Sequence, residues 1–170
     1  MKIRKALASD AKAIAKVHVD SWMTTYRNIV PDSYLDGLKY EDREKLWNEN
    51  LKKCTVFVAE TEAGEVIGFA DGGNERSGDY PGIEGEVYAI YILESYQGQN
   101  IGKRLMQAIS KELLNMDMQS MLVWVLKENL SSGFYEKLGG KVINEKYITI
   151  AGKQIPELAY EWRDVRRILK

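Results

Sequence analysis

The stretch that decides the fold is YAIYILESYQGQNIGKRLMQAI, from Tyr88 to Ile109. Its first part alternates apolar residues at the period of a β-strand, and its last part repeats them at the period of an α-helix. Between the two lies a polar loop that contains glycine, and basic residues follow in the first turn of the helix. Unpaired N–H groups at a helix N-terminus point outward, and the helix dipole adds positive potential there. The stretch therefore predicts a site for an anion such as phosphate.

Two common phosphate-binding motifs do not fit this loop. The P-loop requires G-x-x-x-x-G-K-[ST], but Gly98 and Gly102 stand too close together and no Ser or Thr follows Lys103. The dinucleotide motif G-x-G-x-x-G is absent too, and the strand follows a hairpin instead of opening a series of βαβ units. On these residues by themselves, a plain strand-to-helix turn that uses glycine for geometry alone remains the alternative.

The segments on either side of this stretch have helix and strand patterns in turn. Apolar residues at helical spacing, capping residues and turn signals predict helices at 9–26, 31–38, 40–53, 100–116 and 130–140. Alternating or continuous apolar runs predict strands at 3–7, in a hairpin at 55–73, at 84–93, at 120–126 and in a long hairpin at 141–165 with its turn at Ala151 and Gly152. No repeat, low-complexity segment or linker interrupts the chain, so we expect one domain over residues 1–170.

Composition excludes several classes of partner and site. The chain has 24 basic and 25 acidic residues, a balance that does not favour nucleic acid or an anionic membrane as partner. Cys54 and His18 are its only cysteine and histidine, so we expect no internal disulfide and no metal site. There is no signal-type N-terminus and no run of roughly 20 apolar residues that could span a bilayer. We expect a cytoplasmic protein.

The loop resembles the acetyl-CoA loop of the GCN5-related N-acetyltransferase superfamily, whose pattern is Q/R-x-x-G-x-G/A. Gln97, Asn100 and Gly102 stand at its three defined positions. Asn100 replaces the first glycine, and asparagine is the next-best residue for a positive φ angle. The segment VLKENLSSGFYEKLGG at 125–140 resembles the second cofactor segment of the superfamily, and the element order matches nearly end to end. We expect an α/β fold with a mixed, mostly antiparallel sheet of about seven strands flanked by helices.

The resemblance implies that acetyl-CoA is the co-substrate. The main-chain groups of Ile90, Tyr91 and Ile92 would run beside its pantetheine arm, pairing with it as another strand would. Its diphosphate would lie on the residues from the loop into the helix, which are Gln97, Gly98, Gln99, Asn100, Ile101, Gly102 and Lys103. Asn129 matches a residue that touches the cofactor arm, and it could also cap the helix that follows.

The resemblance also suggests the groups that carry the chemistry. Tyr135 matches a tyrosine that acts as general acid on the departing thiolate, although a buried aromatic anchor is the alternative from the residues alone. Glu86 stands four residues before Ile90, where several members carry a glutamate general base. An exposed charge at the sheet edge is the alternative for Glu86, and Glu84 or water could serve as the base. The main-chain N–H of Ile92 or a neighbour would hold the oxyanion, where a bulge splays the central strand from the next.

The region that joins the first two helices walls the acceptor site in the superfamily. Here it contains Trp22, Tyr26 and Arg27, with Asp20 close by. Aromatic rings beside a carboxylate suit a cationic amine such as a polyamine, and core packing explains the same rings equally well. His18 has no catalytic partner near it in sequence, so a structural role is expected.

Together these features predict an N-acetyltransferase that transfers acetyl from acetyl-CoA to a primary amine in a ternary complex. The acceptor could be a polyamine, an amino acid, another small amine or a protein N-terminus. Cys54 precedes an expected edge strand, which is far from the thioester in the superfamily. A non-catalytic acyl-CoA-binding or regulatory module on the same fold is the alternative. The long final hairpin carries several aromatic residues, which favours a homodimer.

Overall fold

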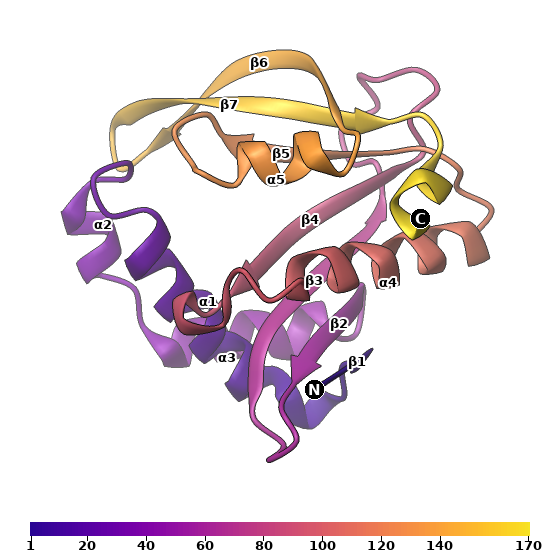
Figure 1. Ribbon diagram of the computed structural model, residues 1–170. Coiled ribbons are helices and arrows are strands. Elements are labelled where there is room, and N and C mark those ends of the chain that lie inside the picture. Colours follow the sequence, from indigo (N-terminus) through magenta and orange to yellow (C-terminus); the bar gives the residue numbers. More distant parts are fainter.

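The computed structural model describes all 170 residues and contains one sheet of seven strands (Figure 1). The strand order is β1-β2-β3-β4-β5-β7-β6, and every neighbouring pair is antiparallel except β4–β5. The strands are β1 (Lys2–Lys5), β2 (Thr55–Glu60), β3 (Val66–Asn74), β4 (Gly85–Ile92), β5 (Met121–Leu126), β6 (Lys141–Ile150) and β7 (Lys153–Trp162). The predicted fold class is confirmed. One detail was wrong, because β2 lies between β1 and β3 and is not an edge strand.

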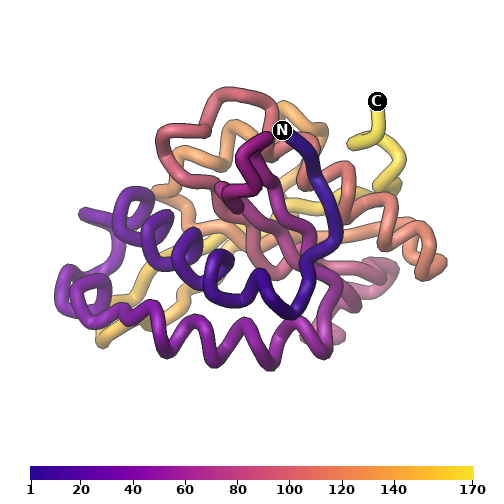
Figure 2. The backbone as a smooth tube through the Cα atoms, turned by 90° about the horizontal axis from the view of Figure 1, so that it is seen from below, coloured from indigo at the N-terminus to yellow at the C-terminus, as the bar shows by residue number.

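The helices are close to the predicted ranges. They are α1 (Ala11–Thr25), α2 (Asp32–Asp36), α3 (Tyr40–Asn50), α4 (Ile101–Asn115) and α5 (Ser132–Lys137). Short 3-10 helices, which the sequence patterns did not predict, occur at η1 (Ala8–Asp10), η2 (Glu94–Tyr96) and η3 (Val165–Leu169). Figure 2 shows α1 and α3 side by side. None of the helices combines the length and the apolar character needed to cross a membrane.

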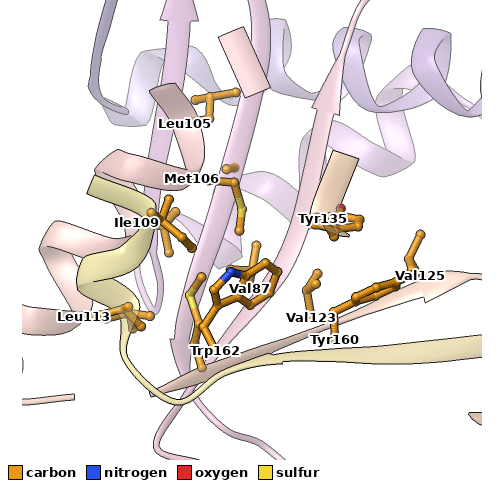
Figure 3. Close-up of a cluster of buried hydrophobic side chains, with 14 of the residues drawn as sticks. Val87, Leu105, Met106, Ile109, Leu113, Val123, Val125, Tyr135, Tyr160 and Trp162 are labelled. Carbon is orange, nitrogen blue, oxygen red and sulfur yellow. The ribbon is translucent and has the colours of Figure 1, made fainter. Parts of the chain in front are cut away.

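The largest core cluster lies between α4 and the sheet. Helix α4 crosses in front of the sheet in Figure 1, and its apolar stripe is fully buried. Figure 3 shows Leu105, Met106, Ile109 and Leu113 of this stripe. They face a set of buried residues from β4, β5, α5 and β7, which are Val87, Val123, Val125, Tyr135, Tyr160 and Trp162. Trp162 also donates its indole N–H to Leu138 O at 2.9 Å, which ties β7 to the end of α5. Helix α5 is therefore held at a fixed place beside the central strands.

The opposite face of the sheet is covered by α1 and α3. Trp47 of α3 and Phe69 of β3 are buried there with their ring centroids 4.8 Å apart. His18 of α1 accepts a hydrogen bond from the Trp47 indole at 3.0 Å and stacks on Tyr91 at 5.4 Å. Burial lowers the pKa of His18 to about 4, so the imidazole is neutral near pH 7. Its contacts are those of a structural residue.

The sheet opens in its middle. Strand β4 pairs with β5 only from Gly85 opposite Met121 to Val87 opposite Val123, although both strands continue beyond these residues. On its other edge β4 carries one extra residue, Tyr88, between the partners of Gly72 and Asp71. Such a bulge bends a strand and increases its twist. The bend leaves the facing edges of β4 and β5 unpaired, which confirms the expected splay.

Candidate active site

Two pockets meet where β4 and β5 separate. The first, which we call the β4–β5 cleft, has a volume of about 940 Å³ and extends from the two strands to the α4 N-terminus and α5. The second, which we call the side pocket, has a volume of about 550 Å³ and lies between α1, β4, β5 and the β6–β7 hairpin. Four aromatic residues line both, namely Tyr26, Tyr88, Tyr91 and Trp124. A ligand in one pocket would therefore adjoin a ligand in the other.

The main chain of β4 turns two of its residues toward the cleft. Leu93 N donates to Ile67 O of β3 at 3.0 Å. Hydrogen-bonded and non-bonded pairs alternate along an antiparallel ladder, so Tyr91 bonds to β3 as Leu93 does. The N–H and C=O groups of Ile90 and Ile92 therefore point away from β3, toward the cleft. β5 does not pair with them there. Ile90 and the N–H of Ile92 thus offer a strand edge that β5 leaves unpaired, while the Ile92 carbonyl accepts a hydrogen bond from Gln97 Nε2 at 3.2 Å.

The loop before α4 has the geometry of an anion site. Asn100 has φ 61° and Gly98 has φ 75°, so asparagine does occupy the left-handed region where the family pattern has glycine. The first backbone bond of the helix runs from Arg104 N to Asn100 O at 3.1 Å. None of the N–H groups from Gly98 to Lys103 donates a hydrogen bond within the chain. They form a row of free donors at the positive end of α4.

Most of the predicted cofactor residues line the cleft. Those that do are Ile90, Tyr91, Ile92, Gln97, Gly98, Asn100, Ile101, Gly102, Lys103 and Asn129. Gln99 does not, and its side chain donates to Ser95 O at 3.4 Å. Arg104 turns instead toward the chain start, where it donates to Met1 O at 3.4 Å. Lys137 of α5 also lines the cleft, and it could not be assigned from sequence because only the docking of α5 brings it there.

Asn129 borders the cleft, but it is not the helix cap that the sequence suggested, because the N-cap of α5 is Ser131. The residue is buried, it lines the cleft, and its Oδ1 accepts a hydrogen bond from Ser131 N at 2.9 Å. That bond shapes the turn that leads into α5. The same side chain therefore fixes the turn and borders the space for a cofactor arm.

Tyr135 stands at the border between core and cleft. It is 4% exposed, its ring lies 5.7 Å from Tyr160 and 6.3 Å from Trp162, and it also lines the cleft. Burial raises the pKa of the Tyr135 phenol well above its ordinary value, so the hydroxyl keeps its proton at neutral pH. A phenol in this state can donate a proton to a leaving group in the cleft.

Glu86 lies in the side pocket and is engaged by Arg76. It is only 3% exposed, so it is not a solvated charge at the sheet edge. Its oxygens accept bonds from Arg76 N at 3.1 Å, Nε at 3.1 Å and Nη2 at 2.5 Å. The alternative base Glu84 lines neither pocket, and its carboxylate accepts from Gln119 N at 2.6 Å. Glu86 is thus the better placed of the two, and Arg76 holds both of its oxygens.

A second carboxylate in the side pocket was not predicted. Glu157 of β7 is 8% exposed, and burial raises its pKa. Lys146 of β6 stands opposite it in the hairpin register, with Nζ 3.5 Å from a Glu157 oxygen and 3.9 Å from the centroid of the Trp124 ring. Alternation along the hairpin could have placed Lys146 and Glu157 on one face. It could not show that this face would close the side pocket.

The three predicted acceptor residues are divided between the pockets. Trp22 and Tyr26 pack edge to face at 4.7 Å, and both line the side pocket. Arg27 lines the cleft and pairs with Asp32 at 3.0 Å and Asp36 at 3.3 Å. The nearby carboxylate expected to join them, Asp20, lies in neither pocket, because it pairs with Lys16 at 2.5 Å and accepts a bond from Tyr40 at 2.6 Å.

Comparisons with known proteins agree with this architecture. Residues 19–140 match the acetyltransferase (GNAT) family. The chain is 42% identical over 163 residues to YuaI, an uncharacterized N-acetyltransferase of Bacillus subtilis (strain 168), covering 96% of this chain and 93% of the relative. It is 25% identical over 149 residues to a spermidine N(1)-acetyltransferase of Thermoplasma acidophilum, covering 84% and 89%. The structure of yncA from Salmonella typhimurium with its cofactor acetyl-CoA has a TM-score of 0.72 at 23% identity, covering 95% of this chain and 92% of that chain.

Proposed function

Because the chain belongs to the acetyltransferase (GNAT) family, we propose that it transfers acetyl from acetyl-CoA in the β4–β5 cleft to a primary amine in the side pocket. The protein is an acyltransferase, and acetyl-CoA is its co-substrate. The observation that carries the proposal is the meeting of the two pockets at the splay, where four aromatic residues line both. An amine bound on one side can reach a thioester bound on the other.

The residues of the cleft fit coenzyme A part by part. The edge of Ile90 and Ile92, where only the Ile92 carbonyl is bonded, by the Gln97 side chain, suits the amides of pantetheine, which would extend the sheet as an added strand. The free N–H groups from Gly98 to Lys103 suit the diphosphate, because they combine hydrogen-bond donors with the positive end of a helix. Lys103 and Lys137 add positive charge to the same cleft.

The proposed chemistry is direct transfer. The amine attacks the thioester carbonyl, a C–N bond forms as the C–S bond breaks, and the N–H of Ile92 stabilises the developing oxyanion. Tyr135 gives its proton to the departing sulfur, and Glu86 takes the proton that the amine loses, after Arg76 has released it. Cys54 lines neither pocket, and burial raises the pKa of its thiol, which argues against an acetyl-cysteine intermediate.

The acceptor is proposed only as a class. The aromatic walls of the side pocket suit an amine, and the relationship to a spermidine acetyltransferase supports a polyamine as one candidate. An amino acid, another small amine or a protein N-terminus fits the same reaction. A cytoplasmic location stays a prediction from the sequence.

One observation favours a second candidate, a module that binds acyl-CoA without turning it over. Both oxygens of Glu86 are held by Arg76, and the alternative base Glu84 lines neither pocket. Two measurements on the whole chain distinguish the candidates: calorimetry with coenzyme A, and thiol release from acetyl-CoA with a panel of amines. The enzyme should do both. Binding of coenzyme A without amine-dependent thiol release would support the binding module instead.

A further inference from the structure

The charges of the side pocket are ordered by depth. Its two ion pairs each join a deep carboxylate to a cation nearer the solvent. The Glu86 side chain is 4% exposed and its partner Arg76 is 61% exposed. The Glu157 side chain is 11% exposed and its partner Lys146 is 48% exposed. Negative charge therefore lies at the floor of the pocket and positive charge at its rim.

The two cations come from different elements, and each lies over an aromatic ring. Arg76 comes from the segment between β3 and β4, and its guanidinium lies 4.2 Å from the centroid of Tyr88. Lys146 comes from β6 and lies 3.9 Å from the centroid of Trp124. Tyr88 and Trp124 line both the side pocket and the β4–β5 cleft. The cations are thus positioned over the rings that border the proposed acetyl site.

The remaining charged group of the pocket is already satisfied within its own loop. Glu75 accepts hydrogen bonds from Ser77 N at 2.9 Å, Ser77 Oγ at 2.6 Å and Gly78 N at 2.6 Å. These bonds hold the turn that presents Arg76. The charges free to meet a ligand are therefore those of the two ion pairs.

We infer that the acceptor carries an acidic group in addition to its amine, as an amino acid does. This inference rests on the proposed function and narrows its substrate class. The ammonium group would enter deep, between Glu86 and Glu157, and the carboxylate would stay at the rim with Arg76 and Lys146. The ammonium would then lie between two carboxylates and the carboxylate between two cations, so each end of the zwitterion meets groups of opposite charge.

This arrangement also explains the engaged state of Glu86. A carboxylate on the acceptor draws Arg76 away, and the freed oxygens of Glu86 then face the amine. A polyamine lacks any group that could draw Arg76 away. Its second ammonium would also lie against the cationic rim, and like charges in contact disfavour binding.

Equilibrium binding to the protein saturated with coenzyme A tests the inference without any need for turnover. The probes are matched trios: L-phenylalanine, L-phenylalaninamide and 2-phenylethylamine, then L-leucine, L-leucinamide and 3-methylbutylamine, with spermidine added. Within each trio the amine and the side chain stay the same, and the carboxylate is kept, converted to an amide or removed. Calorimetry should show the acid of at least one trio binding on the order of tenfold or more tightly than its two counterparts.

Substitutions then assign the preference to the rim. Lys146→Met keeps an aliphatic chain over Trp124 but removes the charge, and Arg76→Met does the same over Tyr88. Each substitution should weaken binding of the amino acid on the order of tenfold. The amide and the decarboxylated amine should bind as before or more tightly. The matched control is Lys111→Met, an exposed lysine of α4 outside both pockets, which should change neither.

The possible results separate this inference from the proposed function. Preferential binding of the acids without thiol release from acetyl-CoA would overturn acetyl transfer and leave the inference standing. Tighter binding of the decarboxylated amines or of spermidine would overturn the inference, whether or not acetyl is transferred. Failure of every carboxylated probe to bind would overturn it as well.

Discussion

At the scale of single residues, Tyr135 combines packing and chemistry. Its ring belongs to the core beside Tyr160 and Trp162, and the residue also faces the cleft. No hydrogen bond within the chain uses its hydroxyl, whereas the hydroxyl of Tyr160 donates to Glu136 at 3.1 Å. Removing the Tyr135 oxygen should therefore affect a ligand in the cleft and leave the core in place.

Tyr135→Phe should lower turnover on the order of a hundredfold, because the departing thiolate loses its proton donor. Binding of acetyl-CoA should stay within about twofold of the parent, since the ring is kept. Steady-state kinetics and calorimetry measure the two effects. Tyr160→Phe is the matched control and should turn over normally. Parent-like turnover by Tyr135→Phe would reduce Tyr135 to a packing residue.

Glu86→Gln should also lower turnover, but with a different dependence on pH. If Glu86 takes the proton from the amine, its loss matters most where the amine is protonated. The ratio of parent to variant turnover should therefore shrink as pH rises, because alkaline solution supplies the free amine. If this ratio stayed constant over roughly two pH units above neutrality, Glu86 would be assigned to holding Arg76 and not to proton transfer.

Asp71 makes a prediction about stability and pH. It is 4% exposed, its Oδ1 has no hydrogen-bond partner, and burial raises its pKa from 3.8 to about 7. Between these two values the folded chain keeps a proton that the unfolded chain has lost. The contribution of Asp71 to stability is therefore complete below pH 3.8 and declines as pH rises toward about 7.

Asp71→Asn removes this decline, because asparagine stays neutral. The variant should gain stability relative to the parent on the order of 1.4 kcal/mol for each pH unit between the two pKa values, with no further gain above them. Urea unfolding from pH 4 to pH 8 provides the curves. The lowered pKa of His18 acts in both proteins and cancels in the difference. A difference that does not change with pH would contradict the prediction.

At the scale of secondary-structure elements, the junction of α4 and α5 depends on Gly102. A glycine at this position lets a ligand approach the backbone closely. In the structure a Cβ at Gly102 would lie 3.1 Å from Phe134 Cζ and 3.2 Å from Cε2. Gly102 therefore also permits close packing between the two helices that frame the cleft.

The methyl added in Gly102→Ala must displace the Phe134 ring, which should outweigh the roughly 1 kcal/mol that alanine gains over glycine in a helix and leave a net destabilisation of about 1 kcal/mol. Acetyl-CoA binding should weaken with it, because α5 forms one wall of the cleft. The double variant Gly102→Ala with Phe134→Leu should recover part of the lost stability, which thermal and urea unfolding measure. Gly133→Ala is the control, since nothing lies within 4 Å of its added Cβ. No recovery in the double variant would show that Phe134 is not the obstacle.

At the scale of the whole molecule, β6 ends the sheet with an exposed edge. Its exposed apolar residues are Val142 at 48%, Ile143 at 36% and Tyr147 at 64%. A long edge strand with apolar residues is a surface that proteins commonly cover. We therefore propose that two copies of the chain associate through this hairpin.

Light scattering should detect a particle of twice the 19.4 kDa chain mass at micromolar concentration. Tyr147→Lys should shift it to the monomer, because a charge on the covered edge opposes pairing. Lys111→Met, which changes a helix on another part of the surface, should leave the dimer intact. A parent protein that is monomeric at 19.4 kDa would end the proposal.

What the sequence by itself determined is the local structure and the cofactor loop. The helix expected at 100–116 is observed at Ile101–Asn115, and the hairpin turn lies at Ala151 and Gly152, which both have positive φ. Asn100 likewise adopts the φ angle that the loop requires. These features follow from periodicity and from residue-specific backbone preferences, which act over a few neighbouring residues.

Only the tertiary structure decided the composition of the side pocket. Glu86 comes from β4 and Arg76 from the loop that precedes it, whereas Lys146 and Glu157 come from the final hairpin. Their proximity depends on the bulge at Tyr88, on the strand order that places β7 beside β5, and on the way the hairpin closes over the splay. Periodicity assigns a residue to a face of its own strand, but the approach of two distant faces is set by packing of the whole core.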